Sequence, residues 1–235
     1  MKLQSFKQGL KDGIPIGLGY FAVAITFGIA AVMGGLTVGQ AVLISLTNLT
    51  SAGQFAGLSI ITAGGGALEV AMSQLIINLR YCLMSFTLSQ KLEKNTRHFH
   101  RFIVAFGNTD EIFGISASKE GKISPYYNYG AMAVAIPGWT LGTLVGAVLG
   151  NVLPEFIVSA LGIAIYGMFL AVFIPPTKTN KAILYVVLLA MLISTLFAVV
   201  PVLKMVSTGF AIIITTVLVA LFGAYFFPVK EGEVA

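Results

Sequence analysis

The chain has 235 residues, of which 57% are hydrophobic and only 10% carry a charge. Soluble domains carry about 25% charged residues, so the composition excludes an ordinary soluble protein. Several apolar runs reach the roughly 20 residues that a helix needs to cross a bilayer. We therefore expect a single all-α polytopic membrane domain over residues 1–235. The net charge of +5 is assigned to membrane topology and not to nucleic-acid binding.

The first apolar span covers residues 13–34 and follows a basic lead, residues 2–11. A run of about 20 residues is longer than the 7–15 residues of a signal-peptide core, so we expect a retained span. Its glycines Gly17, Gly19 and Gly28 favour close packing against a neighbouring helix.

The second segment, residues 38–63, is apolar but interrupted by an uncharged polar stretch over 47–55, in which six of nine residues are polar or Gly. An unsatisfied polar group in hydrocarbon costs several kcal/mol, so this stretch is poorly suited to face lipid. It indicates either a broken, re-entrant helix or an unbroken helix whose small residues touch a neighbour.

Capping-box spacings support the broken helix. Thr37 is followed by Gln40, and Ser51 is followed by Gln54, so two half-helices are predicted to start at these points. A helix N-terminus carries partial positive charge and can hold an anionic group near the membrane midplane.

The third segment, residues 67–89, carries Glu69 and Arg80 on the same helical face. Arg80 falls near the middle of the span, where a charged side chain requires a partner. Glu69 lies eleven residues away, roughly 16 Å along a helix, so it is too distant. A different anion is needed.

The second interrupted segment, residues 102–118, offers that anion. Gly107 suits a helix stop, and Thr109 suits an N-cap followed by Asp110 and Glu111 in the first turn. The pattern predicts two short helices with a break and places one of the two acids opposite Arg80. The alternative is that both acids only cap a surface helix.

The remaining predicted spans cover residues 126–150, 156–174, 183–200 and 207–227. The similarity of residues 26–28 to 140–142 is of the kind that an internal repeat leaves.

Basic clusters indicate the orientation, because cytoplasmic loops are rich in Lys and Arg. They lie at residues 2–11, 91–101, 119–122 and 178–181, with Lys230 near the end. All of them can be cytoplasmic if residues 38–63 and 102–118 are re-entrant. The chain then makes six crossings with both termini in the cytoplasm, whereas a full crossing by 38–63 would make seven. The loop 91–101, which holds both histidines, is expected to be solvated.

The chain resembles the AzlC family of bacterial branched-chain amino acid permeases, which are linked to azaleucine resistance. The resemblance covers nearly the whole chain and rests on motifs in the same order: Gly13–Tyr20 with Phe27-Gly28, Ser51–Phe55, Asn78-Leu79-Arg80, Thr109–Phe113, and Trp139 before Gly142 and Gly146. Where family members often have His after the Arg, this chain has Tyr81.

The resemblance implies export of leucine, isoleucine, valine or methionine through the cell membrane, with ion or proton coupling. It also implies a partner, a small membrane subunit of the AzlD type.

A zwitterionic substrate also suits the residues themselves. A half-helix N-terminus suits its carboxylate, and aromatic side chains suit its apolar part. The expected substrate-binding residues are Asn48, Ser51, Gly53, Gln54, Phe55, Asn78 and Trp139, and the expected charge pair comprises Arg80 with Asp110 or Glu111.

Two other classes of function compete with transport. An intramembrane enzyme is disfavoured because no His lies in an apolar span, Cys82 has no His beside it, and no metal-ligand cluster appears. No cofactor or metal is therefore expected. The alternative that stays open is a channel or structural subunit that does not itself transport a substrate.

Overall fold

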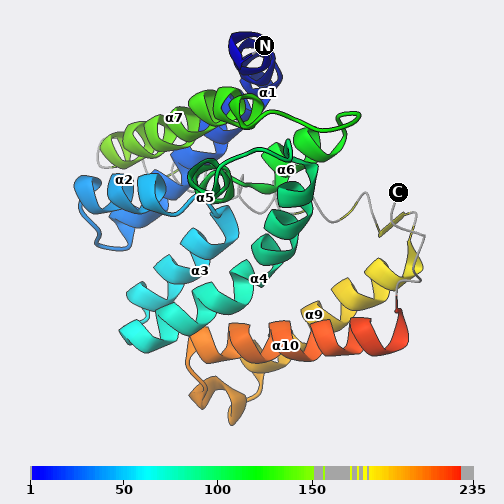
Figure 1. Cartoon of the computed structure of the whole chain (residues 1–235). Helices are drawn as coiled ribbons and strands as arrows, with labels where there is room; N and C mark the ends of the chain where they lie inside the picture. Colours follow the sequence, from blue (N-terminus) through cyan, green and yellow to red (C-terminus); the bar gives the residue numbers. More distant parts are fainter. Residues whose placement is uncertain are drawn as a thin grey trace. The chain divides into compact units, whose positions relative to one another are not determined.

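The computed structural model describes residues 2–150 and 180–228, together with residues 156, 170, 174, 177 and 178 (Figure 1). In this part of the chain all regular elements are helices, apart from one isolated bridge between Leu92 and Ile123. The expected all-α fold is thus confirmed. The predicted span over 156–174 falls, except for three residues, outside the described part.

The helices follow the predicted segments closely. They are α1 (Lys2–Met33), α2 (Val38–Thr47), α3 (Ser51–Thr62), α4 (Ala67–Lys91), α5 (His98–Phe106), α6 (Asp110–Ala117), α7 (Pro125–Leu149), α9 (Lys181–Val199), the short 3₁₀ helix η1 (Leu203–Met205) and α10 (Thr208–Phe226). Both predicted breaks exist, one between α2 and α3 and one between α5 and α6. Within the described residues, α1, α7, α9 and α10 are long and apolar enough to cross a membrane.

Two boundaries differ from expectation. Helix α1 starts in the basic lead, and α5 starts at His98, inside the segment expected to be a solvated loop. This segment is held by tertiary contacts that its sequence does not reveal. The ring of His100 is hydrogen-bonded to the Tyr129 hydroxyl at 2.7 Å, and the Arg101 guanidinium donates to the Ser89 carbonyl at 2.7 Å.

The described residues form two compact units. The first lies within Met1–Gln54 and Asn78–Ile165, and the second within Phe55–Ile77 and Tyr166–Ala235. Helices α3 and α4 each contribute residues to both units.

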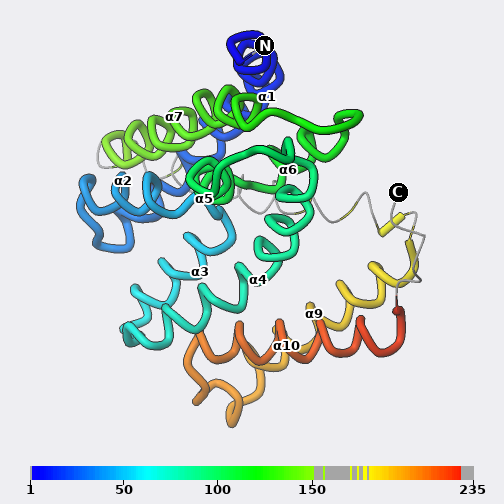
Figure 2. Tube along the Cα trace, in the orientation of Figure 1, coloured from blue at the N-terminus to red at the C-terminus, as the bar shows by residue number. Residues whose placement is uncertain are grey.

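The first unit is built on the contact of α1 with α7, which lie side by side along their length (Figure 2). Glycines on both helices make this approach possible. A Cβ atom at Gly28 would overlap the Thr143 carbonyl, and one at Gly138 would overlap the Gly17 carbonyl. The predicted packing role is confirmed for Gly17 and Gly28, whereas no other described part of the chain comes within 4 Å of a Cβ position at Gly19.

Helices α1 and α7 run in the same direction. Gly9 lies against Tyr127 near the start of both helices, and Ile25 lies against Gly146 near their ends. Two parallel spans require the chain between them to cross back an odd number of times. The expected return by residues 67–89 would satisfy this, but α4 is not among the described helices that are apolar enough to cross, so the crossings by residues 38–63 and 67–89 stay predictions.

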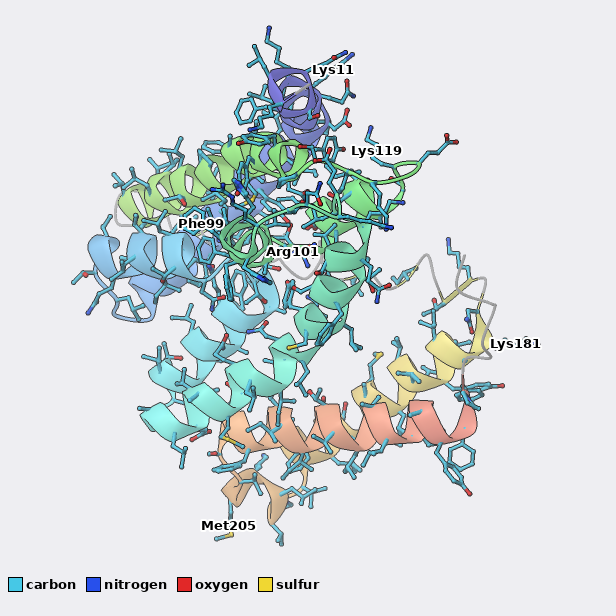
Figure 3. All side chains as sticks on the ribbon, in the orientation of Figure 1. Lys11, Phe99, Arg101, Lys119, Lys181 and Met205 are labelled. Carbon is cyan, nitrogen blue, oxygen red and sulfur yellow. The ribbon has the colours of Figure 1, made fainter. Side chains whose placement is uncertain are left out.

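Three basic segments meet at the N-terminal end of α1 and α7 (Figure 3). The Lys119 ammonium pairs with Asp12 at 2.8 Å, and the Lys122 ammonium donates to the Gln90 carbonyl at 2.6 Å. Lys2 and Arg97 line one cavity at the same end. Segments 2–11, 91–101 and 119–122 therefore lie together, as the positive-inside arrangement requires.

In the second unit, α9 packs against α10, and Glu69 of α4 holds the start of α10. The buried Glu69 carboxylate accepts hydrogen bonds from the Ser207 hydroxyl at 2.6 Å and the Gly209 N–H at 2.7 Å. A carboxylate is favourable at this position because a helix N-terminus carries partial positive charge. Glu69 is thus an N-terminal cap, in line with its exclusion as the partner of Arg80.

The α1–α7 contact predicts unequal effects of the same substitution at two glycines of α1. Gly28→Ala should destabilise the protein by about 3 kcal/mol, because the added methyl meets backbone atoms that cannot rotate away. Gly19→Ala should be neutral or stabilise slightly, since alanine is the better helix former. The midpoint of thermal unfolding in detergent measures both. Equal midpoints for the two variants would contradict the packing described here.

The grouping of basic segments predicts the membrane orientation. In a Cys82→Ala background, cysteines that replace Lys94 and Lys119 should react with a membrane-impermeant maleimide only from the cytoplasmic side. Labelling of position 94 from outside would contradict the re-entrant arrangement and favour seven crossings.

Candidate functional site

The break between α2 and α3 spans residues 48–50 and is built from hydrogen bonds within the segment. The Thr50 hydroxyl accepts from the Gly53 N–H at 3.3 Å, and the Asn48 side chain accepts from the Thr50 N–H at 3.3 Å. Helix α3 starts at Ser51 as predicted, but its cap is Thr50, so the predicted Ser51–Gln54 capping box is wrong. The capping box of Thr37 with Gln40 at the start of α2 is confirmed.

Gln54 has a different role from the one its spacing suggested. Its side chain is 2% exposed and joins the break to α7. The Trp139 indole N–H donates to the Gln54 Oε1 at 3.1 Å, while the Gln54 Nε2 donates to the Asn48 carbonyl. The amide is therefore bonded at both ends, and the bend of the chain at Asn48 is fixed to the rigid α1–α7 pair.

The second break, residues 107–109, lies between α5 and α6. Helix α5 ends at Gly107, and the Thr109 hydroxyl accepts from the Ile112 N–H at 3.4 Å, so both predicted helix signals are confirmed. The Tyr20 hydroxyl of α1 is hydrogen-bonded to Thr109 at 2.7 Å and to the Glu111 carboxylate. The second break is thus also held by α1.

The two breaks face one cavity of about 150 Å³. Four of its lining residues belong to the first break and its flank, three come from the end of α5 and the second break, and one comes from α4. They are Thr47, Asn48, Leu49, Thr50, Ala105, Phe106, Asn108 and Tyr81. The cavity thus brings together segments separated by more than fifty positions in the chain.

A charge pair lies next to the cavity. The Arg80 guanidinium contacts the Asp110 carboxylate at 2.8 Å, and both side chains are about half exposed, at 48% and 46%. Arg80 also donates to the hydroxyl of its neighbour Tyr81 at 3.4 Å, and Tyr81 is hydrogen-bonded to the Thr50 side chain. Of the two acids expected to pair with Arg80, the structure places Asp110 there and directs Glu111 to Tyr20.

The other residues expected at a substrate site do not line the cavity. Ser51 and Gly53 lie in the first turn of α3. Trp139 is buried on α7, and Asn78 lies on α4 two residues before Arg80. Phe55 belongs to the second unit. Of the expected substrate residues, Asn48 is the one that lines the cavity, and the roles of all of them in binding stay predictions.

Of the eight residues that line the cavity, seven were not among the expected site residues, and Tyr81 and Asn108 are two of these. Asn108 stands in the segment Gly107–Asp110, where its neighbours gave clear helix stop and start signals. An amide between such signals is a general sign of a turn, so nothing marked it as part of a site.

Comparison with known proteins agrees with these observations. A family model described as AzlC protein matches residues 15–153, which include α1 from Pro15 onward, both breaks and α7. An uncharacterized membrane protein of Archaeoglobus fulgidus is 31% identical over 179 residues, covering 75% of this chain and 78% of its own. The inner membrane protein YgaZ of Escherichia coli is 26% identical over 174 residues, 71% of each chain.

A further uncharacterized membrane protein, from Helicobacter pylori strain 26695, is 27% identical over 173 residues, which cover 70% of this chain and 75% of its own. No solved structure matches significantly. The family match spans more than half of the chain and contains the whole cavity wall. The chain therefore belongs to the AzlC family of membrane proteins.

Proposed function

We propose that this protein exports branched-chain and similar hydrophobic amino acids across the cell membrane. The observation that carries the proposal is the cavity bordered by two helix breaks, because such breaks expose helix ends of opposite partial charge to one small space. The association of the AzlC family with branched-chain amino acid transport supports the same substrate class.

The start of α3 suits the carboxylate of an amino acid. Thr50, the residue that caps α3, lines the cavity. The N–H groups of Ser51 and Ala52 have no acceptor among the described residues, as is usual for the first turn of a helix. A carboxylate can accept these hydrogen bonds and is stabilised by the positive helix end.

The size and the lining of the cavity suit an aliphatic side chain. A cavity of about 150 Å³ holds a molecule of the size of benzene, which is larger than the four-carbon side chain of leucine. Leu49, Ala105 and Phe106 provide apolar surface.

The Arg80–Asp110 pair is our proposed coupling element. Arg80 contacts both Asp110 and the cavity-lining Tyr81. A change in the charge of Asp110 would therefore alter the electrostatic environment of the cavity wall. We further propose that the protein acts together with a small AzlD-type membrane subunit.

Recognition of the carboxylate can be tested by counterflow of labelled leucine in liposomes, with and without the small subunit. Leucine should compete fully, whereas leucinamide and isoamylamine, which lack the carboxylate, should compete at least about tenfold less well, because hydrogen bonds to a charged group are lost. Full competition by isoamylamine would show that the carboxylate is not recognised. Absence of counterflow under both conditions would favour the structural or channel-forming subunit.

The charge pair yields a second test with a matched control. Arg80→Ala and Asp110→Ala should each lower leucine counterflow by about tenfold or more, and the double variant should be no worse than the poorer single one, because the two residues act as a unit. Glu111→Gln is the matched control, because it changes the neighbouring carboxylate, which is hydrogen-bonded to Tyr20 and not to Arg80.

If Asp110 carries a coupled proton, Asp110→Asn should flatten the pH dependence of counterflow while Glu111→Gln retains it. The same pH profile in the wild type and in both variants would exclude these two acids as proton carriers.

A further inference from the structure

Asn108 of the second break carries a polar group that the fold does not use. Its side chain is 3% exposed, and the Nδ2 donates to the Ser85 hydroxyl at 3.4 Å. The Oδ1 is buried and accepts no hydrogen bond from any described residue. A buried acceptor without a donor is unfavourable, and in native proteins it calls for an explanation.

A second asparagine shows that this feature alone does not identify a site. Asn128 of α7 is fully buried, its Nδ2 donates to the Ser116 hydroxyl at 2.9 Å, and its Oδ1 likewise accepts nothing from the described residues. Asn128 is not part of the cavity wall, whereas Asn108 is. The difference between the two asparagines is that Asn108 lines a cavity.

The wall next to Asn108 is suited to a cation. Thr47 is the last residue of α2, and Ala105 and Phe106 are the last two residues of α5, so two helix C-termini border the cavity. A helix C-terminus carries partial negative charge, which favours a positive group nearby. The Arg80 guanidinium is paired with Asp110 and is not among the residues that line the cavity.

We propose that Asn108 binds the α-ammonium group of the substrate through its Oδ1. This inference rests on the proposed function and completes it, because the carboxylate is assigned to the start of α3 on the other break. The cavity then recognises both charges of an α-amino acid, one at each break. Hydroxy acids and keto acids of the same carbon skeleton are excluded, since they lack the ammonium group.

Equilibrium binding of labelled leucine to the purified full-length protein tests this directly. Unlabelled leucine and 2-hydroxy-4-methylpentanoate, which replaces the ammonium with a hydroxyl, are compared as competitors. The wild type should prefer leucine by about ten- to a hundredfold, the range expected for a hydrogen bond to a charged group. Asn108→Leu removes the polar atoms at similar size and should abolish most of this preference.

Two variants complete the design. Asn128→Leu makes the same change at the matched asparagine outside the cavity and should retain the preference of the wild type. Asn108→Asp keeps acceptor oxygens at the site, so its preference for leucine should be equal to or greater than that of the wild type. If Asn108→Leu does not fold, a loss of preference in Asn108→Asp would overturn the proposal.

The outcomes separate this inference from the proposed function. An unchanged preference in Asn108→Leu overturns the role of Asn108 and leaves export of amino acids intact. Leucine binding with the expected preferences but without counterflow supports Asn108 and contradicts export. A wild type that neither binds nor exchanges leucine contradicts both.

Discussion

The close contact between α1 and α7 is the constraint on which the first unit depends. Glycines bring the two backbones into contact, so that Gly17 and Gly138 leave no room for a side chain between them. Both helix breaks are attached to this pair. Trp139 of α7 binds Gln54 beside the first break, and Tyr20 of α1 binds Thr109 at the second. A rigid pair of helices therefore holds two irregular segments, which would otherwise lack support, at a fixed separation.

This attachment explains how polar backbone can be tolerated in so apolar a chain. An irregular segment in a membrane protein is stable only where protein or a water-filled cavity satisfies its polar groups. At the first break, the Asn48 side chain accepts from the Thr50 N–H, the Thr50 hydroxyl accepts from the Gly53 N–H, and Gln54 donates to the Asn48 carbonyl. These bonds leave the N–H groups of Ser51 and Ala52, in the first turn of α3, without an acceptor among the described residues.

Local patterns predicted most of the fold and only part of the site. Helix ends are set by nearby residues, which is why Thr37 with Gln40 and Thr109 were recognised as caps from the sequence. The Gln54 side chain could not be assigned in the same way. Its position fits a cap, but a partner 85 residues away, Trp139, decides its orientation. Asn108 could not be recognised at all, because its significance depends on a cavity whose other wall is formed by a distant segment.

The contact between Trp139 and Gln54 has a practical consequence. Trp139 is the single tryptophan of the chain, and its indole is buried and hydrogen-bonded to the amide that supports the first break. Indole emission depends on the polarity and hydrogen bonding of its surroundings. All tryptophan fluorescence of this protein therefore originates beside the first break, so the molecule carries its own spectroscopic probe at the point where a moving half-helix would have to separate from its support.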